Sequence, residues 1–337
     1  MIVPGLLNRG DVVRVIAPAS PFDPEMMAHG IVTLRDRMGF EPRHRHDIFT
    51  RRRYLAGDDA RRLEEWREAV ADPEARAIFC ARGGYGAMRI LPQIDPAPLL
   101  TCPKVLVGFS DVTVLHAVLN RAGLATVHGP VLTQLGRAPA PAVEHLHALL
   151  TRAPSPELEG PPAPGAGLSG QATVHPGRVE GPLLGGSLTL LAHLCGTAFL
   201  PPLAGAILAI EDVDERPYRL DRYLTQLRLA GALSGLAGVA IGQFTDCDGQ
   251  GLRGVEVVRD WAAELGVPVA EGFPFGHEDA NHALPLGVRA TLVAPGPDEP
   301  GPPRLLFTGW ADRTLPVSAS PGRPPPSEGA SPARPRD

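Results

Sequence analysis

Apolar and polar positions alternate along the first half of the chain in blocks that indicate strands and helices in turn. Apolar runs of strand length recur between segments whose apolar residues return every three or four positions. Asp23 is placed to cap the first helix, and Gly39 to end it. We expect strands at 12–17, 41–45, 75–80, 105–107 and 125–127, with helices at 23–38, 58–71, from about 112, and at 141–150. This alternation predicts an α/β fold built on a parallel sheet.

The second half repeats the pattern with more β-structure. We expect strands at 206–210 and 237–244, helices at 217–230 and 253–265, and further β-structure at 267–270, 288–293 and 304–308. Between the halves, 151–178 is rich in Pro, Gly, Ala and Ser, as linkers are. The composition of 315–337 predicts a disordered tail. The predicted organisation is an N-terminal α/β domain (1–150), a linker (151–178), a more β-rich α/β domain (179–314) and the tail.

The stretch 104–121 places a serine between a buried strand and a helix. The apolar run 105–107 meets Gly108, and Phe109, Ser110 and Asp111 follow it. The spacing of the later apolar residues is that of a helix face. We therefore expect a sharp turn that exposes the Ser110 hydroxyl beside the free N–H groups of the first helical turn. Taken alone, the pattern favours an ordinary helix-capping serine over a nucleophile.

Two other stretches carry groups that complement a serine. Glu211 and Asp212 follow the apolar run 206–210. A carboxylate at the end of a strand can orient an imidazole or bind a metal, but it is more commonly a solvated turn residue. His277 lies in the turn-rich loop PFGHEDANHALPLG. Serine, glutamate and histidine together supply a nucleophile, an orienting acid and a base. The GxSxG signature is absent around Ser110, which argues against an ordinary α/β-hydrolase.

A glycine turn is expected at the same sheet edge as Ser110. The segment 83–86, Gly-Gly-Tyr-Gly, directly follows the strand 75–80. It is too short a signal for dinucleotide binding, and it fits better as a backbone N–H donor that faces the serine. In parallel sheets, sites form at the carboxyl ends of the strands. The two features together favour a site more than either one alone.

Composition narrows the class of protein. Apolar residues make up 44% and charged residues 20% of the chain, as in soluble globular proteins. A net charge of −5 argues against a nucleic-acid partner. We find no signal-peptide pattern, no membrane-spanning run and no metal-binding motif. The four cysteines are scattered without CxxC spacing, so we expect a cytoplasmic protein without membrane association.

Five motifs, in order, carry a family resemblance. They are ARGGYGAMRILPQID, VGFSDVTVLHAVLN, GPLLGGSLTLLAHLCGT, AILAIEDVDERPYRLDRYLTQL and PFGHEDANHALPLG. In these motifs the chain resembles the serine-type LD-carboxypeptidases, which are murein tetrapeptide carboxypeptidases with microcin C self-immunity hydrolases as relatives. The resemblance extends from about residue 10 to residue 308.

The resemblance implies a function and a set of site residues. Ser110 would be the nucleophile, Glu211 the triad acid and His277 the base, with the backbone N–H groups of Asp111 and Gly84 forming the oxyanion hole. The implied reaction releases the C-terminal D-alanine of murein tetrapeptide by cleaving an L,D-amide bond, in cell-wall peptide recycling. It needs no metal or organic cofactor. A homodimer is also implied.

Two further expectations concern the site itself. Because Ser110 precedes the predicted linker whereas Glu211 and His277 follow it, we expect the site between the domains. A carboxypeptidase must also bind a free carboxylate, for which an arginine is the natural partner. Arg82, beside the glycine turn, is the candidate, and a structural salt bridge is an equally good interpretation of it.

Two rival functions stay open. One is a microcin C-type or other peptide-amide hydrolase. Against it, Trp66, Trp261 and Trp310 all lie away from the loop after Leu190, so that loop has no tryptophan on which a nucleobase would stack. The other is a two-domain ligand-binding module without catalytic activity. The sequence does not distinguish diaminopimelate from lysine at the third position of the peptide.

Overall fold

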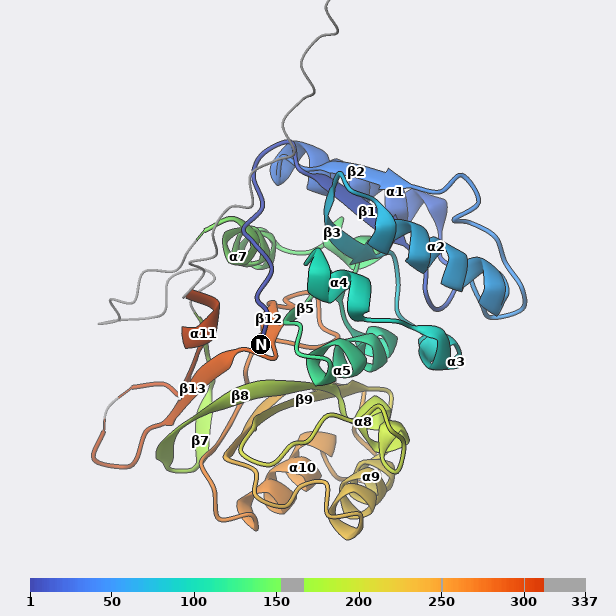
Figure 1. The fold of residues 1–337 in the computed structure, drawn as a ribbon. Helices are drawn as coiled ribbons and strands as arrows, with labels where there is room; N and C mark the ends of the chain where they lie inside the picture. The colour runs from blue at the N-terminus through green and yellow to red at the C-terminus, as the bar shows by residue number, and fades with distance from the viewer. Residues whose placement is uncertain (153–166, 250, 300, 312–337) are drawn as a thin grey trace, which may run out of the picture.

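The computed structural model describes residues 1–152, 167–249, 251–299 and 301–311, which form two sheets lying one above the other (Figure 1). The first sheet has the order β12-β5-β4-β3-β1-β2. Neighbouring strands in this sheet run parallel, except that β12 pairs antiparallel with β5. Its strands are β1 (Val12–Ile16), β2 (Glu41–His44), β3 (Ala75–Cys80), β4 (Val105–Gly108), β5 (Thr126–His128) and β12 (Leu284–Leu286).

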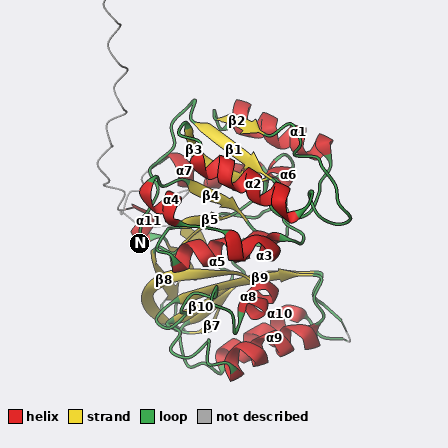
Figure 2. Ribbon diagram, turned by 45° about the vertical axis from the view of Figure 1, so that its right-hand side comes forward, coloured by secondary structure: helices red, strands yellow, loops and turns green. Residues whose placement is uncertain are grey.

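Helices flank the first sheet, as the alternating pattern predicts (Figure 2). Asp23 and Asp58 cap α1 and α2 by accepting hydrogen bonds from backbone N–H groups of the first turn. After α1 the chain continues as a short π-helical segment to Arg37, and Gly39 ends it with a φ of 78°. The helices are α1 (Pro24–Val32), α2 (Asp59–Ala71), α3 (Ala87–Ile90), α4 (Ala97–Thr101), α5 (Thr113–Arg121), α6 (Leu132–Leu135) and α7 (Ala140–Thr151).

The second sheet has the order β6-β14-β13-β8-β9-β10-β11-β7. Its centre, β8 to β11, is parallel, and antiparallel strands extend it on both sides. Helices α8 (Leu188–Leu194), α9 (Pro217–Leu229) and α10 (Gly254–Ala263) gather below it, and α11 (Thr308–Ala311) follows the last strand (Figure 1). The strands are β6 (Gly167–Ser169), β7 (Ala172–His175), β8 (Gly177–Ser187), β9 (Ile207–Val213), β10 (Gly238–Thr245), β11 (Val269–Glu271), β13 (Arg289–Ala294) and β14 (Arg304–Leu306). The predicted mixed α/β fold class is confirmed.

Helix α5, which follows Ser110, packs directly on the second sheet (Figure 2). A Cβ added at Gly186 of β8 would lie 2.5 Å from Thr113 Oγ1, so only glycine allows this approach. The same hydroxyl accepts a hydrogen bond of 3.1 Å from Ser187 N. The glycines of β8 therefore let α5, the helix after Ser110, contact β8, which in turn pairs with β9.

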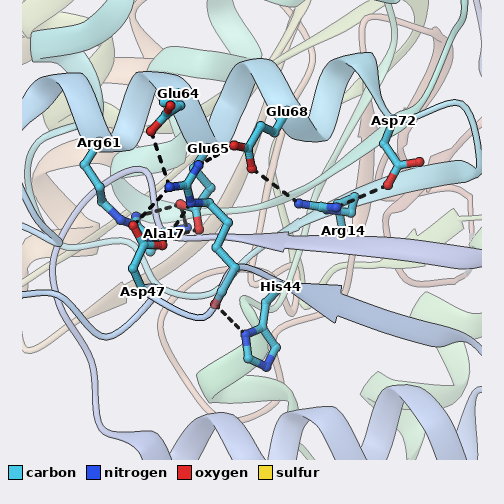
Figure 3. A network of polar contacts seen from close by, with 10 residues as sticks. Arg14, Ala17, His44, Asp47, Arg61, Glu64, Glu65, Glu68 and Asp72 are labelled. Atoms are coloured by element: carbon cyan, nitrogen blue, oxygen red, sulfur yellow. Dashed lines mark hydrogen bonds and ion pairs between the residues drawn. The ribbon is translucent and has the colours of Figure 1, made fainter.

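A charged network fixes α2 over the end of β1 (Figure 3). Ala17 N, just after β1, donates to Glu65 Oε2 at 2.7 Å, and Arg61 donates to the same carboxylate. At the other end of the helix, Arg14 of β1 bonds Asp72 at 3.2 Å. Burial raises the pKa of Glu65, and the arginine and backbone donors oppose that rise. The network holds the carboxyl end of β1 beside α2.

Two of the predicted segments lie partly or wholly outside the described residues. Within the predicted linker 151–178, residues 153–166 lie outside the described residues, whereas the later part forms β6, β7 and the start of β8. The predicted tail 315–337 lies entirely outside them. The division into two domains stays a prediction, although β12 connects the halves by joining the first sheet from the second half of the chain.

Candidate active site

Ser110 lies in the turn between β4 and α5, as the sequence predicts. It begins a single 3₁₀ turn, Ser110–Val112, with a φ of 63°, a conformation that non-glycine residues seldom adopt. A Cβ added at Gly83 would lie 2.8 Å from Ser110 Cβ and 3.1 Å from its Oγ. The glycine turn after β3 therefore lies directly against the serine side chain, and this contact needs a residue without a side chain.

Asp111 joins the serine turn to the glycine turn. Its Oδ2 accepts a hydrogen bond of 2.8 Å from Ala87 N, at the end of the glycine turn. Burial raises the pKa of Asp111 to about 6. Ser20, after β1, supports the same turn, because its N–H donates to Gly83 O and its Oγ accepts from Tyr85 N at 3.0 Å. Sequence reasoning missed Ser20, which has only its position after a buried strand as a signal.

Glu211 and His277 form a hydrogen-bonded pair. Nδ1 of His277 donates to Oε2 of Glu211 over 2.7 Å, and the Glu211 side chain has no exposed surface. Burial opposes charge on both groups. The imidazole nevertheless keeps the pKa of Glu211 below its usual value, and the carboxylate keeps the pKa of His277 above its usual value. Glu211 lies inside β9 rather than after it, because the strand extends to Val213.

Phe109 connects this pair to the serine. Its ring centroid is 4.7 Å from that of His277, and Ser110 is the next residue. Among the described residues Ser110 Oγ makes no hydrogen bond, including none to His277. This is compatible with a catalytic pair, because in many hydrolases the bond between serine and histidine tightens only when substrate binds. The structure thus places the three predicted groups in one region, with the acid and base in direct contact.

The loop that carries His277 is held from both halves of the chain. Gly276, with a φ of 137°, donates through its N–H to Asn281 Oδ1. The fully buried Asn281 amide donates to Gln134 Oε1 at 3.1 Å, and Gln134 of α6 donates to Glu278 O at 3.0 Å. The position of His277 therefore depends on the first half of the chain as well as on its own loop.

Two sequence profiles match the chain. The profile of the LD-carboxypeptidase N-terminal domain matches residues 13–129, and that of the LD-carboxypeptidase C-terminal domain matches residues 180–292. The chain belongs to the LD-carboxypeptidase family. The family prediction is confirmed, and the protein is a peptidase of the carboxypeptidase type.

Named relatives of the chain agree with the profiles. The murein tetrapeptide carboxypeptidase of Pseudomonas aeruginosa is 38% identical over 83% of this chain and 92% of its own. The microcin C7 self-immunity protein of Escherichia coli is 28% identical over 71% of this chain and 77% of its own. The crystal structure of muramoyltetrapeptide carboxypeptidase from Oxalobacter formigenes superimposes with a TM-score of 0.75, at 28% identity, over 87% of this chain and 97% of the other.

The remaining residues predicted for the site lie around the glycine turn. Gly84 has a φ of 99° and lies against Ser20, so the glycine closest to the Ser110 side chain is Gly83. Arg82 is exposed and donates to Pro21 O at 2.8 Å. Arg82 makes no salt bridge within the described part of the chain, so the alternative role of a structural salt bridge is not observed there.

A polar cavity of about 760 Å³ borders the His277 loop at the carboxyl edge of the second sheet. Asp214, three residues after Glu211, and Glu278, next to His277, both line it. Arg216 and Arg253 add positive charge. In the described ranges, no group of three or more His, Cys, Asp or Glu side chains is arranged to hold a metal ion, and no helix there is long and apolar enough to cross a membrane.

Proposed function

We propose that the protein is a serine carboxypeptidase in which Ser110 is the nucleophile, His277 the base and Glu211 the orienting acid. The observation that carries the proposal is the 2.7 Å hydrogen bond from His277 Nδ1 to a fully buried Glu211. This bond assigns the ring proton to Nδ1, which leaves Nε2 as the acceptor that a serine hydroxyl requires. The strained Ser110 turn supports the nucleophile's role.

The reaction then follows from these positions. His277 Nε2 takes the hydroxyl proton as Ser110 Oγ attacks the carbonyl carbon, and the charge of Glu211 stabilises the imidazolium that forms. The backbone N–H groups of Asp111 and Gly84 bind the developing oxyanion, each lowering the barrier by about 3 kcal/mol. The imidazolium returns its proton to the leaving amine. Water, activated by the same imidazole, releases the acyl group and restores the serine.

The proposed substrate is murein tetrapeptide, which loses its C-terminal D-alanine by cleavage of an L,D-amide bond. The name of the Pseudomonas aeruginosa relative supports this assignment. Arg82 is proposed to bind the free carboxylate, because its guanidinium is exposed and, among the described residues, bonds only to a backbone carbonyl. We place the reaction in cytoplasmic recycling of cell-wall peptides, by a homodimer.

Mass spectrometry of murein tetrapeptide incubated with purified protein tests this function. We expect wild type to release D-alanine, with chelator present, and Ser110→Ala to release none above background. Ser234→Ala, an exposed serine near α9 and away from the site, is the matched control and should retain full activity. D-Alanine release by Ser110→Ala at the wild-type rate would reject Ser110 as nucleophile.

The microcin C7 self-immunity relative favours a second candidate, an aminoacyl-nucleotide amide hydrolase. Trp66, Trp261 and Trp310 are all buried in the cores, so none of them offers a stacking surface for a base. We expect turnover of such an amide to be far below that of the tetrapeptide. Comparing kcat/KM for the two substrates separates the candidates. Failure of a serine-directed phosphonate to label Ser110, together with inactivity on both substrates, would instead indicate a binding module.

A further inference from the structure

The carboxylate of Glu211 has one oxygen that the catalytic proposal leaves unused. Oε2 accepts from His277, whereas Oε1 is buried and has no hydrogen-bond partner among the described residues. Buried charged atoms are almost always hydrogen-bonded, because desolvation without compensation is unfavourable. A donor for Oε1 is therefore to be found among its neighbours.

His128 is near enough to this carboxylate for the two groups to act on each other electrostatically. It is the last residue of β5, and its side chain has no exposed surface. Its ring meets those of Phe109 and Phe275 at centroid distances of 5.8 and 6.2 Å. Since Phe109 also contacts His277, the two histidines belong to one aromatic cluster. Both ring nitrogens of His128 lack a partner within the described ranges.

His128 is a neutral imidazole near pH 7 and can donate one hydrogen bond through its ring N–H. Burial lowers the pKa of His128 to about 4, although the charge of Glu211 acts in the opposite direction. The ring is therefore neutral near pH 7, with one N–H and one lone pair. His128 and Glu211 influence one another electrostatically, yet no direct hydrogen bond joins them in the described part of the chain.

Three other groups near Glu211 or His128 are possible donors, and two of them, Asp212 and His116, are set aside by the bonds they already make. The carboxylate of Asp212 accepts from Thr189 and Val213. His116 donates from Nε2 to Gly108 O, so its Nδ1 carries a lone pair. Ser187, the register partner of Glu211 on β8, accepts from Leu190 N as the cap of α8. The Ser187 hydroxyl is the main competitor of His128 as the donor.

We propose that His128 is a positioning residue whose N–H holds Oε1 of Glu211 through one bridging water molecule. A water within about 2.8 Å of both atoms joins groups that are too far apart for a direct bond. The bridge satisfies two buried atoms at once and fixes the plane of the carboxylate. His277 is oriented by the other oxygen of that carboxylate, so the effect of His128 on the reaction is indirect. This effect rests on the proposed function.

Loss of the bridge has two consequences. The carboxylate gains rotational freedom, so His277 spends less time aligned with Ser110, and kcat falls. More negative charge also remains on Oε2, which stabilises the imidazolium and raises the pKa of His277. Of the groups that face His277, Glu211 and Asp212 both favour its protonated form, and neutral His128 does not reverse that sign.

Two substitutions test the proposal. His128→Phe keeps a planar ring and removes the N–H, and His128→Gln keeps an amide N–H. For His128→Phe we expect kcat on murein tetrapeptide to fall on the order of tenfold. We also expect the acid limb of kcat/KM, and the His277 pKa measured by ¹⁵N-histidine NMR, to move to higher pH. His128→Gln should recover part of kcat and of the shift, and it replaces the Phe variant if that fails to fold.

Thr291→Val is the matched control. Thr291 Oγ1, on β13 of the second sheet, is likewise buried and unpartnered among the described residues. Replacing such a hydroxyl by a methyl group is neutral or stabilising, and it should leave the His277 titration unchanged. If His128→Phe behaves like Thr291→Val, the proposal is wrong. It is also overturned if Ser187→Ala, and not His128→Phe, shifts the titration.

The two proposals fail in different ways. The NMR titration needs no substrate, so it decides the role of His128 even if wild type and Ser110→Ala both leave the tetrapeptide intact. An inactive Ser110→Ala combined with an unchanged titration in His128→Phe refutes the positioning role alone.

Discussion

At the scale of single residues, the site depends on charges and contacts that are hidden from solvent. Glu211 is fully buried and still anionic, because His277 donates to it. The sign of the coupling follows from this arrangement. The carboxylate raises the pKa of His277, so the protonated imidazole stabilises the fold fully below about pH 6.5. That stabilisation disappears as the pH rises through the pKa of His277 in the folded protein.

Glu211→Gln tests this coupling through the pH profile. The substitution removes the charge that raises the pKa of His277, so the acid limb of kcat/KM should move to lower pH. We expect kcat to fall on the order of 10³-fold or more, because the imidazolium loses its partner and the ring its orientation. A profile with the wild-type acid limb would contradict the assigned pair.

Gly83→Ala probes the contact between the glycine turn and the nucleophile. The new Cβ would lie 2.8 Å from Ser110 Cβ, so the serine must shift. A displacement of this size in a nucleophile lowers kcat on the order of 100-fold, with little loss of stability. Gly5→Ala, where a Cβ meets nothing within 4 Å, is the control for both kinetics and thermal unfolding. Wild-type kcat in Gly83→Ala would show that the turn tolerates the contact.

The sequence predicts residue types at the site better than their contacts. The expected positions of Ser110, Glu211 and His277 converge in space, because Ser110 and His277 lie in turns between strands and helices or strands, and Glu211 lies near the carboxyl end of β9. Ser20, Gln134 and Asn281 were missed, since a buried polar side chain that holds a loop has no periodicity of its own. His128 lies one residue beyond the predicted strand 125–127, and no motif marks it.

At the scale of elements, α2 holds two strand ends together. The guanidinium of Arg62 is buried and donates from Nη1 to Pro18 O at 2.6 Å and to Gly86 O at 2.7 Å. It also pairs with Asp59. The loop after β1 and the glycine turn after β3 are thus fixed to one helix, which keeps that turn beside Ser110.

Arg62→Met should destabilise the protein by about 2–4 kcal/mol. The variant leaves two buried carbonyl groups without their donor, and each loss has a desolvation cost. Arg67→Met, on the exposed face of the same helix, should change the free energy of unfolding by less than about 0.5 kcal/mol. Urea unfolding of the two variants gives the comparison. Equal stability of the two would refute the role of Arg62.

The elements that were predicted correctly are those with clean periodicity, such as β1, β3 and α9. Strand β8 was not predicted, because four glycines in eleven residues mask a strand pattern. Those glycines serve close packing instead: a Cβ at Gly185 would lie 1.8 Å from Ala209 O. Strand β12 has only three residues, and its pairing with β5 depends on contacts far apart in sequence.

At the scale of the whole molecule, the two halves share a core. Buried side chains from both sheets, such as Val107 and Leu183, belong to one hydrophobic cluster. Trp310 Nε1 donates to Leu149 O at 2.8 Å, and β12 completes the first sheet from the second half. The halves therefore stabilise each other more than independent domains do.

Residues 1–152 expressed alone should not fold cooperatively. Without β12 the edge of β5 is open, and the surface that α5 presents to β8 is exposed. We expect an aggregated or molten fragment in circular dichroism and urea unfolding, and a single cooperative transition for the full chain. A sharp transition for the fragment would establish the first half as an autonomous domain.

The path of the chain through the His277 loop has a consequence for synthesis. The loop leads within a few residues into β12, which joins a sheet whose other strands have already left the ribosome. We therefore expect the proposed base to reach its acid only when the last strand of the first sheet is in place. A nascent chain that ends before residue 286 contains the proposed nucleophile but lacks the complete machinery to activate it. Peptidase activity should therefore appear late in translation, as one event with the closing of the sheet.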